Sequence, residues 1–93
     1  MSFRLRETAR RNIQQIDAYL RAQSPVAAAG AARHFLTTFE RLSAFPYSGH
    51  PTSRTGVRAT AIPGTRYVVT YRVLPTGDVE IIAIIHTARD RKA

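Results

Sequence analysis

The sequence contains no cysteine. Without cysteine the chain can form neither a disulfide framework nor a metal site built from thiolates. Its longest strongly apolar run, Ile81–Ile85, is far shorter than the roughly 20 residues that a membrane-spanning helix needs. Residues 1–6 carry charge but no apolar stretch, so we expect no secretory signal, no membrane contact and a cytoplasmic protein.

Lysine and acidic residues are scarce. Lys92 is the only lysine beside 13 arginines, and six acidic residues leave a formal net charge of +8. Arginine presents a planar fork of donors that suits carboxylates and phosphates. Because net charge bears on partners rather than on fold, three partner classes fit: nucleic acid, a nucleic-acid enzyme, and an acidic protein that neutralises this one.

Several catalytic patterns are also missing, namely a glycine-rich phosphate loop, a Ser–His–Asp order and paired catalytic carboxylates. The three histidines, His34, His50 and His86, show no ligand spacing such as i, i+4, so we expect no metal and no cofactor. His34 lies beside Phe35 on a predicted helix, which favours a position on the helix surface.

What is present fits one globular domain over residues 1–93, with 44% hydrophobic and 22% charged residues. Apolar residues spaced by four and three predict an amphipathic helix from about Glu7. Ser24 is a good N-cap and Pro25 a good first helical residue, so a second helix begins at once and ends before Pro46. So short a connection predicts an antiparallel helix hairpin.

After a loop over residues 46–56 the apolar period changes to two, which predicts strands. The expected strands are a brief one at residues 2–5, then Val57–Ile62, Tyr67–Leu74 and Val79–His86. Tyr67 and Tyr71 share a face, where core packing is favoured over base stacking. We therefore expect an α+β fold, in which a short N-terminal strand and the helix hairpin pack on one face of a small, mainly antiparallel sheet of three to four strands.

The last predicted strand is apolar on both faces in its middle, which is typical of a strand covered on both sides. Only seven residues follow His86, and they are polar and charged, so they are not expected to bury the second face. An apolar strip rimmed by arginine would then mark an interaction surface. Alternatively, arginine stems and the 46–56 loop cover it. The candidate residues of this strip are Val68, Leu74, Ile82 and Ile84.

Local patterns in a fixed order add a family resemblance. They are Ser24-Pro25 before an alanine-rich start, Leu42–Pro46 with Gly49, Gly56-Val57-Arg58, Tyr67–Val73, and Ile81–His86 with Arg89. Over about residues 3–90, their order and spacing resemble the ParE/RelE superfamily of bacterial toxin–antitoxin toxins. RelE-like members resemble ribosome-associated mRNA endonucleases, whereas ParE-like members poison DNA gyrase without known hydrolytic chemistry. Members of both branches are neutralised by a co-expressed antitoxin.

The resemblance leaves two mechanisms to weigh. Metal-free RNA cleavage needs a base, an acid and cations for the phosphate, and His86 with Arg58, Arg66 and Arg89 offers these groups. RelE-like enzymes, however, carry lysines in the loop before the last strands and a tyrosine or histidine after the final arginine. Here the loop has only Arg54, and no tyrosine follows Arg89. The ParE-like mechanism is therefore favoured.

The resemblance thus implies a gyrase inhibitor with a plasmid-stabilising role and a cognate acidic ParD-like antitoxin. The alternatives are an mRNA interferase that contacts ribosome or nucleic acid, and a non-toxic arginine-rich module that retains only antitoxin binding. On the favoured hypothesis His86 is a hydrogen-bonding residue at a strand end, and no residue is catalytic. The predicted partner-binding residues are Arg58, Arg66, Val68, Arg72, Ile82, Ile84, His86 and Arg89.

Overall fold

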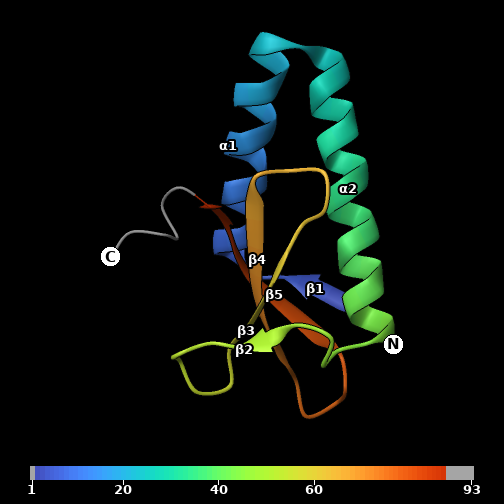
Figure 1. The fold of residues 1–93 in the computed structure, drawn as a ribbon, viewed down its shortest axis with the longest axis vertical. Helices are drawn as coiled ribbons and strands as arrows, with labels where there is room; N and C mark the ends of the chain where they lie inside the picture. Colours follow the sequence, from blue (N-terminus) through green and yellow to red (C-terminus); the bar gives the residue numbers. More distant parts are fainter. Residues whose placement is uncertain (1, 88–93) are drawn as a thin grey trace.

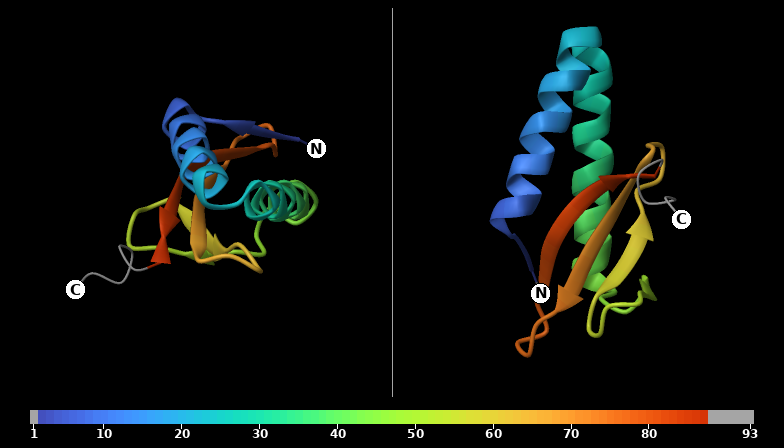
Figure 2. Two further views of the ribbon diagram at one scale, coloured as in Figure 1. Left: turned by 90° about the horizontal axis from the view of Figure 1, so that it is seen from above. Right: turned by 90° about the vertical axis from the view of Figure 1, so that its left-hand side faces the viewer.

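The computed structural model of the chain describes residues 2–87. Its elements are β1 (Phe3–Leu5), α1 (Glu7–Gln23), α2 (Pro25–Ala44), β2 (His50–Pro51), β3 (Arg58–Ala61), β4 (Tyr67–Val73) and β5 (Val79–His86). The strands form one sheet in the order β1-β5-β4-β3-β2, in which only β1 and β5 are parallel neighbours. The helices pack as a hairpin on one face of this sheet (Figures 1 and 2). The predicted α+β architecture is confirmed.

The turn between the helices depends on Ser24. Its backbone N–H donates to the Leu20 carbonyl at 2.7 Å and so closes α1, while its hydroxyl accepts from the Ala27 N–H at 3.2 Å and so caps α2. Pro25 occupies the first turn of α2, where its missing N–H costs nothing. One residue therefore ends one helix and begins the next, which holds the hairpin tight. Neither described helix is both long enough and apolar enough to cross a membrane.

The core lies between the helix hairpin and the sheet. Phe39 of α2 packs on Phe3 with ring centroids 5.3 Å apart, and Phe35 meets Tyr67 edge-on at 5.9 Å. Tyr71 is fully buried, which confirms that this face of β4 serves packing rather than base stacking. The buried core residues are Ala9, Phe35, Phe39, Leu42, Ile62, Val69, Tyr71, Val79, Ile81 and Ile84.

The pairing of β4 with β5 contains one irregularity. Consecutive residues of β4 pair with Ala83 and Ile81, so Ile82 is an extra residue in β5. A bulge of this kind reverses the face that the following side chains occupy. Ile84 is consequently directed toward the helices, where it is 5% exposed and belongs to the core. The prediction that Ile84 shares the uncovered face with Ile82 is wrong.

The loop predicted over residues 46–56 contains the two-residue strand β2, so the sheet has five strands rather than three or four. The Tyr71 hydroxyl holds the start of this loop, because it accepts from the Gly49 N–H at 3.0 Å and donates to the Pro46 carbonyl at 2.8 Å. A Cβ on Gly49 would lie 2.5 Å from that hydroxyl oxygen. Glycine is therefore required here for close approach.

Candidate functional site

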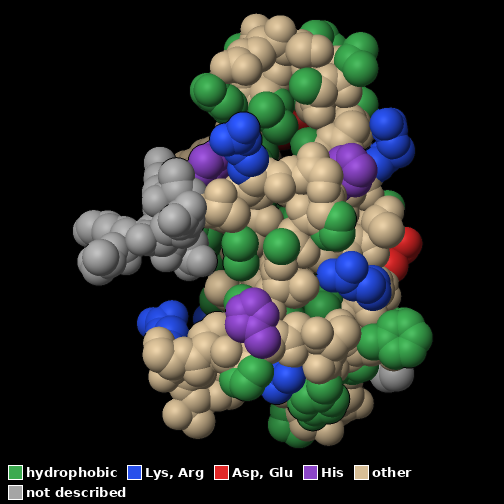
Figure 3. Space-filling model, in the orientation of Figure 1, with side chains coloured by type: hydrophobic (Ala, Val, Ile, Leu, Met, Phe, Trp, Pro, Cys, Tyr) green, Lys and Arg blue, Asp and Glu red, His purple; other side chains and the backbone are tan. Residues whose placement is uncertain are grey.

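The face of the sheet opposite the helices is the first part of the candidate site. We define the open face as Val68, Thr70, Ile82, Ala83 and Ile85, which are all partly exposed; they alternate with the buried residues of β4 and β5 except at the bulge, where Ile82 and Ala83 are consecutive. No described helix covers it (Figure 2). Figure 3 looks at this side of the molecule and shows hydrophobic side chains in the middle with arginines around them. Leu74, also expected here, follows the last residue of β4.

An ion-pair cluster lies at the end of the open face nearest β1. Arg72 Nε and Arg6 Nη2 both donate to Glu80 Oε1 at 2.8 Å. The Arg6 hydrogen bond, together with that of Arg72 and both positive charges, holds the pKa of Glu80 below its ordinary value, although burial acts the other way. The predicted partner-binding Arg72 is thus already paired within the chain.

This cluster predicts a pH dependence of stability. A carboxyl whose pKa is lowered on folding stabilises the fold above its unfolded pKa, and that stabilisation is lost as the pH falls through the folded pKa. Between about pH 6 and about pH 3, we expect the free energy of unfolding to fall more steeply for the wild type than for Glu80→Gln. Urea unfolding over this pH range measures the free energy of unfolding of both proteins. If it falls equally steeply for the wild type and for Glu80→Gln, the role of Glu80 is contradicted.

Arg58 is the first residue of β3, and its guanidinium also has partners within the chain. Its Nη2 donates to the Gly49 carbonyl at 2.6 Å and to the Tyr47 carbonyl at 3.3 Å, and its guanidinium lies 5.3 Å from the centre of the Tyr47 ring. Arg58 therefore fixes the 46–49 loop, a role that the sequence did not indicate because its partners are backbone carbonyls.

The structure does not bring Arg58 to His86. Arg58 pairs with Tyr71 and His86 with Tyr67, four residues away along β4. That separation is about 13 Å at 3.3 Å per residue. The third predicted phosphate clamp, Arg89, lies outside the described residues.

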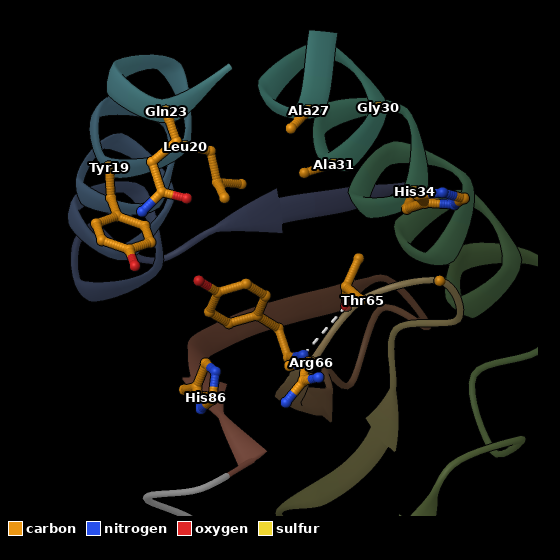
Figure 4. A pocket seen from close by; sticks show the side chains of 12 residues that line it. Tyr19, Leu20, Gln23, Ala27, Gly30, Ala31, His34, Thr65, Arg66 and His86 are labelled. Carbon is orange, nitrogen blue, oxygen red and sulfur yellow. Dashed lines mark hydrogen bonds between the residues drawn. The ribbon is translucent and has the colours of Figure 1, made fainter. Parts of the chain in front are cut away.

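Arg66 and His86, in contrast, share one pocket at the other end of β4 (Figure 4). The Thr87 N–H donates to the Arg66 carbonyl at 2.8 Å, which keeps the end of β5 beside Arg66. The His86 ring packs edge-on against Tyr67 with centroids 5.3 Å apart. The pocket has a volume of about 540 Å³ and is lined by Tyr19, Leu20, Gln23, Ala27, Gly30, Ala31, His34, Gly64, Thr65, Arg66, Tyr67 and His86.

Of the twelve residues that line this pocket, only Arg66 and His86 were predicted as site residues, and Tyr19 and His34 are the most informative of the other ten. Tyr19 is 60% exposed and lines the pocket. In the sequence it lies next to the apolar stripe of α1 rather than in it, and this position could have identified it as an exposed aromatic residue. His34 is exposed, as predicted, but its imidazole meets Gly64 so closely that a Cβ there would lie 2.8 Å from the ring. Among residues 2–87, the pocket lining contains no carboxylate, so its arginine, imidazole and hydroxyl groups suit an acidic ligand group. Among the described residues, no cluster of three or more potential ligands could hold a metal ion.

Comparison with known proteins identifies the family. The family described as the ParE toxin of the type II toxin–antitoxin system parDE matches residues 3–91. The chain belongs to the ParE toxin family. It is 32% identical over 85 residues to Y4kP of Sinorhizobium fredii, a protein named as a toxin, and this match covers 89% of the chain and 86% of Y4kP.

Solved structures agree on the ParE fold. A chain of the chromosomal ParDE system from P. aeruginosa matches with a TM-score of 0.79 and 20% identity, over 92% of this chain and 95% of that one. The isolated E. coli RelE toxin matches with a TM-score of 0.61 and 11% identity, over 91% and 82%. The predicted membership of the superfamily, on the ParE side, is confirmed, and the family is one of toxins of type II toxin–antitoxin systems.

Proposed function

We propose that this ParE-family chain inhibits DNA gyrase by binding it in the cytoplasm, and that a cognate acidic ParD-like antitoxin neutralises it. The family match over residues 3–91 carries the proposal. The charge of the chain supports it, because a net charge of +8 favours an acidic protein partner and raises its rate of association.

The open face supports the antitoxin part of the proposal. Val68 and Ile85 are direct cross-strand neighbours, and Ile82 extends the same partly exposed apolar surface. An antitoxin segment would lay apolar side chains over these residues and place carboxylates near Arg66 at the rim. Ile84, which is buried in the core, is removed from the predicted contact set.

The separation of Arg58 from His86 supports binding rather than cleavage. A nuclease centre needs its acid, base and phosphate clamp around one reacting group. Here Arg58 holds the 46–49 loop, while His86 packs on Tyr67 at the other end of β4. The proposed mechanism therefore does not use the predicted nuclease set of His86, Arg58, Arg66 and Arg89.

The variant His86→Gln tests the choice between the mechanisms. As a general acid or base, His86 would be worth about 10²–10⁴ in rate, so toxicity would disappear from a folded protein. As a residue that packs at a strand end, its replacement would remove about 0.5–1.5 kcal/mol of ring contact, so growth arrest is expected to fall by no more than about tenfold. Growth arrest on induction measures the effect, with antitoxin binding as the control for folding. Message cleavage by the wild type that is lost, together with growth arrest, in a folded His86→Gln protein would contradict the binding mechanism.

A further inference from the structure

A second exposed surface lies at the end of the sheet that carries the 46–49 loop (Figure 1). We name it the aromatic–arginine end and define it as Phe45, Tyr47, Arg54 and Arg58. The Phe45 and Tyr47 side chains are 65% and 68% exposed, although they flank a segment that is firmly attached to the core. Large exposed aromatic side chains beside arginine are the residue types that dominate binding energy at protein interfaces.

The backbone around these rings is held from both sides. Arg58 binds the carbonyls of Tyr47 and Gly49, and Tyr71 binds the Pro46 carbonyl and the Gly49 N–H. The Ser48 N–H also donates to the Phe45 carbonyl at 3.0 Å. A surface fixed in this way loses little conformational entropy when a partner binds, so its contacts contribute more of their energy to affinity.

A pocket of about 330 Å³ opens beside the Tyr47 ring. Among the described residues, its lining includes Val57, Val73, Arg54 and Arg58 and no acidic residue. Because Arg58 Nη2 already donates to the carbonyls of Tyr47 and Gly49, the exposed Arg54 supplies the guanidinium for a ligand. Guanidinium groups bind carboxylates through two parallel hydrogen bonds. The pocket is therefore complementary to an acidic side chain next to an apolar one.

The composition of the pocket favours a protein over a nucleic acid. Proteins that follow a nucleic-acid strand present a groove with a row of cationic side chains. Of the described arginines, only Arg54 and Arg58 line this pocket, and the guanidinium groups of Arg6 and Arg72 are paired with Glu80 elsewhere on the sheet.

We propose that the aromatic–arginine end binds an acidic segment of the protein that the toxin inhibits, while the antitoxin covers the open face. This inference rests on the proposed function in one respect, that the inhibited protein is DNA gyrase.

Two variants test the inference. Arg54→Glu reverses one charge, and it keeps the backbone contacts of residue 54, whose N–H donates to the Thr52 hydroxyl and whose carbonyl accepts from the Val57 N–H. Tyr47→Ser removes the exposed ring. The matched controls on α2 are Arg33→Glu, which reverses an exposed arginine, and Val26→Ser, which removes a side chain that is 81% exposed. Thermal unfolding confirms that all four variants are folded.

The measurements are growth arrest on induction, inhibition of purified gyrase, and affinity for the antitoxin. We expect both test variants to be about 30-fold weaker in growth arrest and in gyrase inhibition, the factor for one hot-spot side chain, and both controls to match the wild type. Antitoxin affinity should stay within about threefold for all four, because the open face is unchanged.

The other possible outcomes distinguish an error in the proposed surface from an error in the proposed target. If the wild type inhibits gyrase and Arg54→Glu inhibits it equally well, the surface is wrong and the function stands. If the wild type leaves gyrase untouched but arrests growth, and the test variants fail to do so, the target is wrong and the surface stands. Test variants that lose binding to a short DNA duplex in proportion to their loss of toxicity would overturn the inference in favour of a nucleic acid.

Discussion

Replacing Ile84 by alanine is expected to lower the free energy of unfolding by about 2–5 kcal/mol, the usual cost of removing a buried isoleucine side chain. Ile84 is 5% exposed and belongs to the core between the helices and the sheet. Because small domains are stable by only about 5–15 kcal/mol, such a loss is a large share of the total. Denaturant unfolding followed by circular dichroism measures it.

The matched control is Ile82→Ala, two residues earlier on the same strand. Ile82 is the extra residue of the bulge and lies on the partly exposed open face, so its replacement should cost about 1 kcal/mol or less. It should weaken antitoxin binding instead. Equal losses of stability for the two variants would show that β5 alternates without a bulge and that Ile84 does not reach the core.

The second large effect is expected at Gly49. In Gly49→Ala, the new methyl group would lie 2.5 Å from the Tyr71 hydroxyl oxygen and 2.8 Å from the Ala59 carbonyl oxygen. Either the loop or Tyr71 must move, so we expect a loss of about 1–3 kcal/mol in the free energy of unfolding. Toxicity should fall with it, because the same contacts hold the aromatic–arginine end in place.

Gly30→Ala is the control for this substitution. Gly30 lies inside α2, where an added Cβ would find no atom closer than the Arg33 guanidinium at 3.9 Å. Alanine is favoured over glycine in a helix by about 0.5–1 kcal/mol, so this variant should be more stable than the wild type. The two Gly→Ala changes are thus expected to shift the denaturation midpoint in opposite directions. A Gly49→Ala protein as stable as the wild type would contradict the close approach of the loop to Tyr71.

Local signals were sufficient for most of the fold. Ser24-Pro25 determined where α1 ends and α2 begins, and the change of apolar period after residue 56 located β3, β4 and β5. The strand β2 was missed because two paired residues produce no periodic pattern. The bulge was missed for a different reason. A strand with apolar residues on both faces keeps its pattern when the register shifts by one, so the sequence Ile81–Ile85 is compatible with either face for Ile84.

The candidate site was less accessible to sequence reasoning. Arg72 and Arg58 were chosen for their charge, but their strongest partners are Glu80 and two backbone carbonyls, and these depend on packing that connects distant residues. Two of the exposed aromatic side chains, Tyr19 and Tyr47, lie outside the periodic patterns that identify core residues. Their positions became informative only when the pockets beside them were known.

The most direct test of the central claim is a supercoiling assay with purified gyrase, relaxed plasmid and ATP, to which the purified chain and then its antitoxin are added. The account predicts that the chain blocks supercoiling and increases the amount of cleaved plasmid, and that an equimolar amount of antitoxin restores activity. In cells the same chain should cause DNA breaks while messages stay intact. Unimpaired supercoiling at concentrations of the chain that arrest growth, together with messages cut within codons, would contradict the account and favour a ribosome-dependent nuclease.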